Sequence, residues 1–161
     1  MATIELLGTI LDVKITEDFL GRGSFTGIDL GKYPQANKIQ VTFSEKNILT
    51  SEGVMDWLNW TKSHAQFNNP QLILSQCPVT FVRQISSIAQ FLPVGCVMES
   101  FYAPFYSEET SETKQALLKK GIDFGNDFLK TPECLDSKGN QMELDAIPEV
   151  YFGFLRINLQ T

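Results

Sequence analysis

The sequence contains few residues that form covalent cross-links or bind metals. Among its 161 residues are three cysteines (Cys77, Cys96 and Cys134) and a single histidine, His64. Three scattered cysteines are too few for the disulfide framework of a small secreted protein, and an odd number of free thiols is typical of the reducing cytoplasm. A single histidine excludes a metal site built from several histidines.

The chain also lacks a surplus of positive charge and a long apolar run. Lysine and arginine total 13 against 19 acidic residues, which gives a formal net charge of −6. Nucleic-acid binding needs cations that displace counterions from phosphates, so we expect no nucleic-acid partner. Residues 1–14 hold no basic segment ahead of an apolar run, and charge or glycine interrupts the longer apolar stretches. We therefore expect a cytoplasmic protein without membrane insertion.

Hydrophobic residues make up 43% of the chain and include twelve phenylalanines, which is enough material for a buried core. The length is close to that of a single domain. Alternating or continuous apolar patterns predict strands at 3–15 (a strand or bent hairpin around Gly8), 38–44, 71–75 and 94–102. Helical patterns begin at Thr50 or Ser51 and at Cys77-Pro78. This alternation predicts an α/β fold, with a mixed central β-sheet flanked by helices.

The last third of the chain has a different character. Its pattern predicts a helix at 112–120, a hairpin within 131–145 around Gly139-Asn140, and a short helix from Pro148. We expect residues 1–106 to form the α/β domain. Residues 107–161 then form a C-terminal extension packed on it, so that the whole is one compact unit.

The first helix carries the most informative side chains. Val54, Trp57, Leu58 and Thr61 follow helical spacing and predict a buried stripe, which places Trp60 and His64 on a neighbouring face. One reading has Trp60 exposed as an anchor for a partner protein. The other has both tryptophans in the core. We expect His64 to lie at the surface or at an interface, near the end of the helix.

Three segments resemble the STAS family of sulfate-transporter and anti-sigma-factor-antagonist domains. They are the helix start Thr50-Ser51-Glu52-Gly53, the run from QLILSQCPVTFVRQ to VMESFYAPFY, and the closing PEVYFGFL. In that family the helix start reads roughly Asp-Ser-Ser-Gly, and its first serine can be phosphorylated. The resemblance covers about 38–106, and more weakly 131–155.

The resemblance implies a non-catalytic regulatory domain of bacterial signalling that acts through protein–protein contacts. Its partner would be a kinase, an anti-sigma factor or a receptor-type regulator, and a homodimer is compatible with it. Ser51 would occupy the phosphorylation position. From the resemblance and the helix pattern together, the expected partner-binding residues are Thr50, Glu52, Gly53, Trp57, Trp60 and His64.

Two departures from the family pattern change these expectations. Thr50 replaces the aspartate and Glu52 replaces the second serine, so a phosphoryl group on Ser51 would be repelled by a neighbouring carboxylate. We expect weak or absent phosphorylation there. Members with a C-terminal extension often carry two Cys-x-x-Cys pairs that hold zinc. Here the matching positions are 107–110 and 134–137, where only Cys134 remains, so we expect no metal and no other cofactor.

Few residues of the sequence are of the types and spacings that catalysis requires. Cys77 opens a helix, where the helix dipole lowers a thiol pKa, and His64 is the sole candidate base. Acidic pairs such as Glu108-Glu109 lie in a polar segment. We expect no enzyme activity. The alternative is a small-ligand-binding domain or a minor hydrolase that uses a face shared by Ser51 and Cys77.

Overall fold

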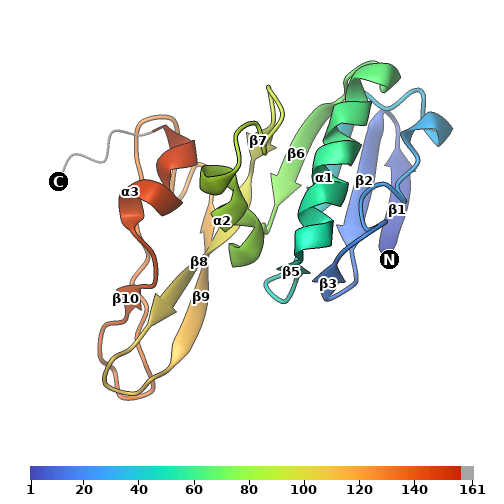
Figure 1. Ribbon diagram of the computed structural model, residues 1–161. Coiled ribbons are helices and arrows are strands. Elements are labelled where there is room, and N and C mark those ends of the chain that lie inside the picture. Colours follow the sequence, from blue (N-terminus) through green and yellow to red (C-terminus); the bar gives the residue numbers. More distant parts are fainter. Residues whose placement is uncertain (157–161) are drawn as a thin grey trace.

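A five-stranded sheet forms the centre of the computed structural model, which describes residues 1–156 (Figure 1). Its strand order is β1-β2-β4-β6-β7. The strands are β1 (Ala2–Leu7), β2 (Ile10–Ile15), β4 (Lys38–Thr42), β6 (Gln71–Ser75) and β7 (Val97–Met98). The β1–β2 hairpin is antiparallel and turns at Gly8, whose φ is 65°, whereas β2, β4, β6 and β7 run parallel. The predicted mixed α/β sheet is confirmed.

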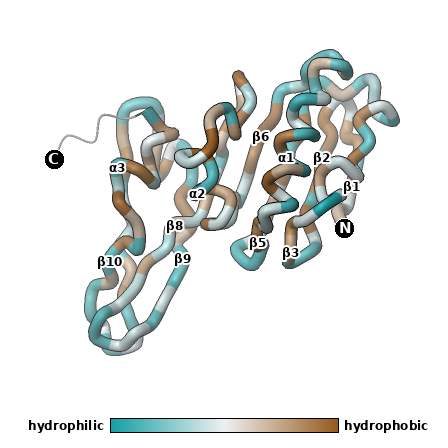
Figure 2. Tube along the Cα trace, viewed as in Figure 1, coloured by the Kyte–Doolittle hydropathy of each residue, from teal (hydrophilic) through white to brown (hydrophobic). Residues whose placement is uncertain are grey.

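Two helices cover one face of this sheet, α1 (Ser51–Ser63) and α2 (Val79–Ser87). Alternate residues of β4 and β6 are buried beneath them, namely Ile39, Val41, Leu72 and Leu74. An aromatic cluster joins the helices to the sheet, with Trp57 of α1 packed against Phe25 and Phe81 at centroid distances of 5.0 and 4.9 Å. In Figure 2, brown and teal segments alternate along α1, as expected for a helix with one buried side.

Two very short strands lie beside the start of α1. β3 (Phe19–Leu20) and β5 (Ile48–Leu49) pair in parallel, with Phe19 opposite Ile48 and Leu20 opposite Leu49. Leu20 and Leu49 are buried, whereas Phe19 and Ile48 point outward. Two single turns complete this half of the molecule, η1 (Leu30–Lys32) and η2 (His64–Phe67).

The segment predicted as one strand at 94–102 is two strands in different sheets. β7 ends the central sheet, and β8 (Ser100–Tyr106) lies in the middle of a second, three-stranded sheet of order β10-β8-β9. Cys77 connects the two sheets, since its amide donates to Ser100 O and its carbonyl accepts from Tyr102 N.

The helix predicted at 112–120 is wrong, because this segment is the strand β9 (Thr113–Lys119). β9 pairs antiparallel with the whole of β8, from Tyr106 opposite Thr113 to Ser100 opposite Lys119. Its local sequence Ala-Leu-Leu-Lys favours a helix. The antiparallel pairing with β8 gives hydrogen-bond partners to the backbone groups of every second residue of β9, and these bonds outweigh the helix propensity.

The C-terminal elements are short. β10 (Glu143–Leu144) pairs antiparallel with β8. The predicted hairpin around Gly139 is present only as a single antiparallel bridge between Leu135 and Gln141. α3 (Pro148–Tyr151) and η3 (Gly153–Leu155) pack on α2 and β8, where the Tyr151 hydroxyl donates to the Tyr102 carbonyl. The predicted division into domains at residue 106 stays a prediction.

No helix within residues 1–156 is long and apolar enough to span a membrane.

Candidate functional site

The first turn of α1 is tied to the end of β3 by Thr50. The Thr50 hydroxyl accepts from the Gly53 amide at 3.1 Å, so Thr50 is the helix cap, one of the two predicted candidates. Its hydroxyl and its amide both donate to the Leu20 carbonyl, at 2.9 and 3.0 Å. The cap therefore fixes the position of Ser51, which is exposed at the first position of the helix.

Gly53 is buried, which corrects its predicted role in partner binding. A Cβ at this position would lie 2.0 Å from the Leu20 carbonyl oxygen and 2.9 Å from Leu49 Cδ1. No side chain fits in that space, so the helix reaches β3 and β5 only because residue 53 is glycine. Gly53 thus lets α1 pack closely on β3 and β5, but it is not itself accessible to a partner protein.

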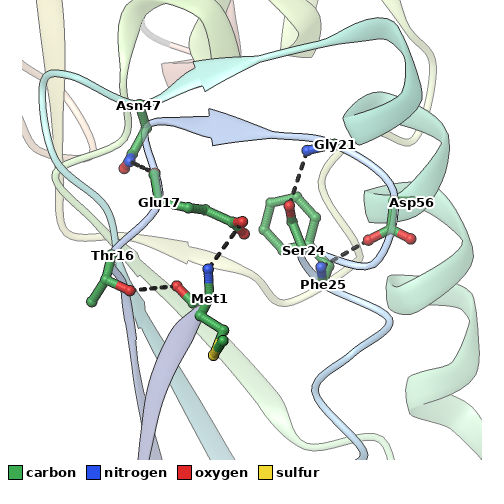
Figure 3. Close-up of polar contacts among 8 residues, drawn as sticks. All are labelled: Met1, Thr16, Glu17, Gly21, Ser24, Phe25, Asn47 and Asp56. Carbon is green, nitrogen blue, oxygen red and sulfur yellow. Dashed lines mark hydrogen bonds and ion pairs between the residues drawn. The ribbon is translucent and has the colours of Figure 1, made fainter.

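A buried carboxylate, Asp56, holds the glycine-rich loop against α1 (Figure 3). It is 6% exposed and accepts hydrogen bonds from the amides of Gly23, Phe25 and Thr26 at 2.9, 2.7 and 3.1 Å. The Thr26 hydroxyl donates a fourth at 2.6 Å. Burial alone raises the pKa of Asp56, but these hydrogen bonds outweigh it and hold the pKa below its ordinary value of 3.8.

The sequence reasoning missed Asp56 because it followed apolar residues only. The buried positions of α1 are Gly53, Asp56, Trp57 and Trp60, which also follow helical spacing. The predicted stripe of Val54, Trp57, Leu58 and Thr61 is therefore rotated from the true one by about one position.

Both tryptophans lie in the core, so of the two readings the buried one is confirmed, and the reading of Trp60 as an exposed anchor, with the partner-binding role expected of Trp57 and Trp60, is wrong. Trp57 is 0% and Trp60 is 2% exposed. Each indole has a backbone partner: Trp57 Nε1 donates to Phe91 O at 2.8 Å, and Trp60 Nε1 donates to Ile28 O at 3.2 Å. The loop ending at Ile28 covers the face of α1 that carries Trp60, so neither indole is open to a partner protein.

Intrinsic fluorescence tests this burial. With both indoles in the core, we expect a blue-shifted emission maximum and weak quenching by acrylamide in the native protein. The urea-unfolded protein serves as the reference for free access. Strong quenching of the native protein would contradict the burial of Trp60.

His64 is also buried, at 2% exposure, which corrects its predicted surface position. Its ring packs edge-on against Trp60 at a centroid distance of 4.7 Å. Burial lowers the pKa of His64 to about 4. The imidazole is therefore neutral at physiological pH and is part of the α1 core.

The histidine gives a pH prediction. In the unfolded chain His64 takes up a proton near pH 6.5, whereas in the folded chain it does so only near pH 4. Between these two pH values the unfolded chain binds a proton that the folded chain does not. The free energy of unfolding is therefore not reduced by His64 above about pH 6.5, and it decreases as the pH falls toward 4. We expect the His64 Cε1 proton signal to titrate near pH 4 in the native protein, and His64→Gln to remove the stability change in that window. A midpoint near 6.5 in the native state would contradict this.

Three exposed apolar side chains lie on the elements at the start of α1: Phe19 on β3, Ile48 opposite it on β5, and Met55 in α1 itself. Phe19, Ile48 and Met55 are 66%, 44% and 58% exposed. Ser51 and Glu52 are exposed on the same turn of the helix, and Glu52 pairs with Arg22 at 3.6 Å. We call these residues the docking surface: Phe19, Arg22, Ile48, Ser51, Glu52 and Met55. Phe19 and Ile48 were missed from the sequence, because outward-facing positions of two-residue strands leave no periodic pattern. Met55 was missed as well; it is an exposed position of α1 outside the buried stripe.

Two hollows adjoin the docking surface. A groove of about 440 Å³ runs along α1 between Arg22, Ser51, Met55 and Asn59. A larger cleft of about 830 Å³ begins at Ile48 and extends between α2 and the β8–β9 hairpin. Hydrogen bonds at its edge hold β3 and β5 in place, since Asn47 Nδ2 donates to Glu17 O at 2.7 Å (Figure 3).

Ser51 and Cys77 do not share a face, which corrects the alternative based on them. Cys77 is 0% exposed, whereas Ser51 is on the surface. Burial raises the pKa of the Cys77 thiol well above 9.0, and the neighbouring Cys96 adds to the rise. The expectation of a lowered thiol pKa at this helix start is wrong, because desolvation outweighs the helix dipole.

Hydrogen bonds around Asp136 occupy the region matched to the cysteine pairs. Ser107 Oγ donates to Asp136 at 2.7 Å, Thr110 Oγ1 at 3.4 Å and Asn140 Nδ2 at 3.1 Å. The bond from Ser107, followed by those from Asn140 and Lys138, lowers the pKa of Asp136. Within residues 1–156 no three His, Cys, Asp or Glu side chains group as metal ligands. That the protein binds no zinc stays a prediction, which one zinc per chain in elemental analysis would contradict.

Comparisons with protein-family models, with curated proteins and with solved structures found no match to this chain. Its function therefore has to be argued from the docking surface and its surroundings.

Proposed function

We propose that this chain is a non-catalytic regulatory domain of STAS type that acts in bacterial signalling, in the cytoplasm, by binding a partner protein through the docking surface. The observation that carries the proposal is the exposure of Phe19, Ile48 and Met55 around a helix start that is itself rigidly held. Exposed apolar side chains grouped beside charged ones are typical of protein interfaces. The partner is a kinase, an anti-sigma factor or a receptor-type regulator.

The surroundings of Ser51 support this location for the interface. Ser51 stands at the first position of a thirteen-residue helix, and Arg22 lies beside it across the groove. The helix end and Arg22 both favour a negative charge, whereas Glu52 opposes one. We accordingly keep the expectation of weak or absent phosphorylation, which stoichiometric phosphate on Ser51 after kinase treatment would contradict.

The absence of enzyme activity belongs to the same proposal. The candidate thiol and the candidate base, Cys77 and His64, are buried, at 0% and 2% exposure. Neither group is placed to exchange protons with a bound substrate at neutral pH.

A capture experiment tests the proposal. Tagged wild-type protein should recover a specific partner from its native cells, and Phe19→Ser/Met55→Ser should recover at least tenfold less. Val94→Ser is the matched control, because Val94 is fully exposed and lies outside the docking surface. Equal recovery by the double variant would overturn the proposed interface. Turnover of generic ester or nucleotide substrates by the wild-type protein would overturn its non-catalytic nature.

A further inference from the structure

The strand β1 is an unprotected edge of the central sheet. Within residues 1–156 its backbone pairs with β2 on one side, and no other strand pairs with it (Figure 1). Its residues Ala2-Thr3-Ile4-Glu5-Leu6-Leu7 include no proline and no lysine, two usual means of preventing edge-to-edge pairing, and Glu5 is its one charged side chain. The strand is therefore a template for a further strand.

The hydrogen bonds to β2 fix which groups face the open edge. The Thr16 amide donates to Met1 O at 3.0 Å, so Met1 and Thr16 form a hydrogen-bonded pair. Pairs of this kind alternate along an antiparallel ladder, so Thr3 and Glu5 direct their backbone groups toward β2. The N–H and C=O groups of Ala2, Ile4 and Leu6 consequently point outward.

A second β1 fits this edge in one register. When Ile4 lies on a twofold axis, Ile4 faces Ile4 and Ala2 faces Leu6, so the outward backbone groups of all three residues find partners. These residues are half-buried and apolar, and they lie on the core-facing side of the strand. Moving the axis to Glu5 would place two carboxylates directly opposite each other, which is unfavourable.

Charges on the other side of the sheet agree with this register. Thr3 lies opposite Lys14 on β2, and Glu5 lies opposite Asp12. With the axis at Ile4, Glu5 of the second copy lies opposite Thr3 and in one row with Lys14. Lys14 and Glu5 are both exposed, so each side of the axis holds one Lys14 and one Glu5 of the other copy in the same row, about 10 Å apart across Thr3. Lys14 also pairs with Asp12 of its own strand at 3.6 Å. The register thus places opposite charges rather than like charges in the row.

We propose that the chain forms a twofold-symmetric homodimer in which β1 pairs antiparallel with β1 of a second copy, centred on Ile4. The two central sheets then form one continuous sheet. This surface is built from residues other than those of the docking surface, so the dimer and the proposed partner interface succeed or fail independently.

Cysteine cross-linking in the full chain tests the register. The background carries Cys96→Ser and Cys134→Ser, because those thiols are partly exposed, whereas Cys77 is buried. Thr3→Cys protein mixed with Glu5→Cys protein should give a disulfide-linked dimer in high yield under mild oxidation, since directly opposed residues lie within disulfide reach. Each variant oxidised alone should remain uncross-linked. Efficient cross-linking of Glu5→Cys alone would overturn the register, and no cross-link in the mixture would overturn the dimer.

Sedimentation equilibrium gives the second measurement. The wild-type protein should sediment as a dimer at micromolar concentration. Ile4→Pro removes an N–H that faces outward and leaves the bonds to β2 intact, so it should raise the dimer dissociation constant at least tenfold while the circular dichroism spectrum stays native. A wild-type monomer, or an unchanged dissociation constant for a folded Ile4→Pro protein, would overturn the proposal.

Discussion

Gly53→Ala is expected to lower the free energy of unfolding by about 3 kcal/mol or more, although alanine is the better helix former by about 1 kcal/mol. The reason is the 2.0 Å distance between a Cβ at this position and the Leu20 carbonyl oxygen. That oxygen also accepts both hydrogen bonds from Thr50, so it cannot move away without breaking the cap. The helix must shift from β3 and β5, and this shift uncovers the buried side chains of Leu20 and Leu49.

Urea denaturation followed by circular dichroism measures this change. Gly153→Ala is the matched control, because a Cβ at Gly153 meets no atom within 4 Å. The control should stay within about 0.5 kcal/mol of the wild-type protein. An unchanged unfolding midpoint for Gly53→Ala would show that α1 does not depend on this close approach. Because the docking surface rests on β3 and β5, the same variant should also bind the partner more weakly.

The central part of the fold could be predicted from the sequence because its signals are local. Gly8 in an apolar alternating run predicted the first hairpin, and Thr50 before a helical pattern predicted the start of α1. Strands alternating with helices then predicted the α/β sheet in which β4, β6 and β7 lie side by side. The C-terminal third was harder, because β9 is a strand only through its ladder with β8, a contact that local propensity does not report.

The candidate site was predicted only in part for a related reason. Ser51 and Glu52 are exposed at the helix start as expected. Trp60 is buried because the loop that Asp56 holds brings Ile28 over it, and a long-range contact of this kind leaves no trace in helical spacing. Phe19 was missed because its exposure depends on the pairing of two-residue strands.

Asp56→Asn is expected to destabilise the protein by about 3 kcal/mol at pH 7 and to loosen the loop at 21–27. The carboxylate accepts four hydrogen bonds, and an asparagine has one oxygen to offer and directs an NH₂ group at the remaining donors. Buried donors that lose a charged acceptor cost more than the average hydrogen bond. The loop covers Trp60, so the variant should also show stronger acrylamide quenching of its fluorescence.

The pH dependence of the free energy of unfolding shows whether Asp56 stabilises the loop through its charge or only through packing. The pKa of Asp56 is lower in the folded chain than its ordinary value of 3.8, so its contribution is complete above about pH 4 and is lost as the pH falls through the folded pKa. The difference in unfolding free energy between wild-type protein and Asp56→Asn should therefore be constant from pH 5 to pH 8 and should shrink below about pH 4. Asp29→Asn is the control, because Asp29 is exposed and accepts one hydrogen bond, from the Gly31 amide, at the start of the single turn η1. A difference that stays constant down to pH 2 would mean that the charge of Asp56 does not hold the loop.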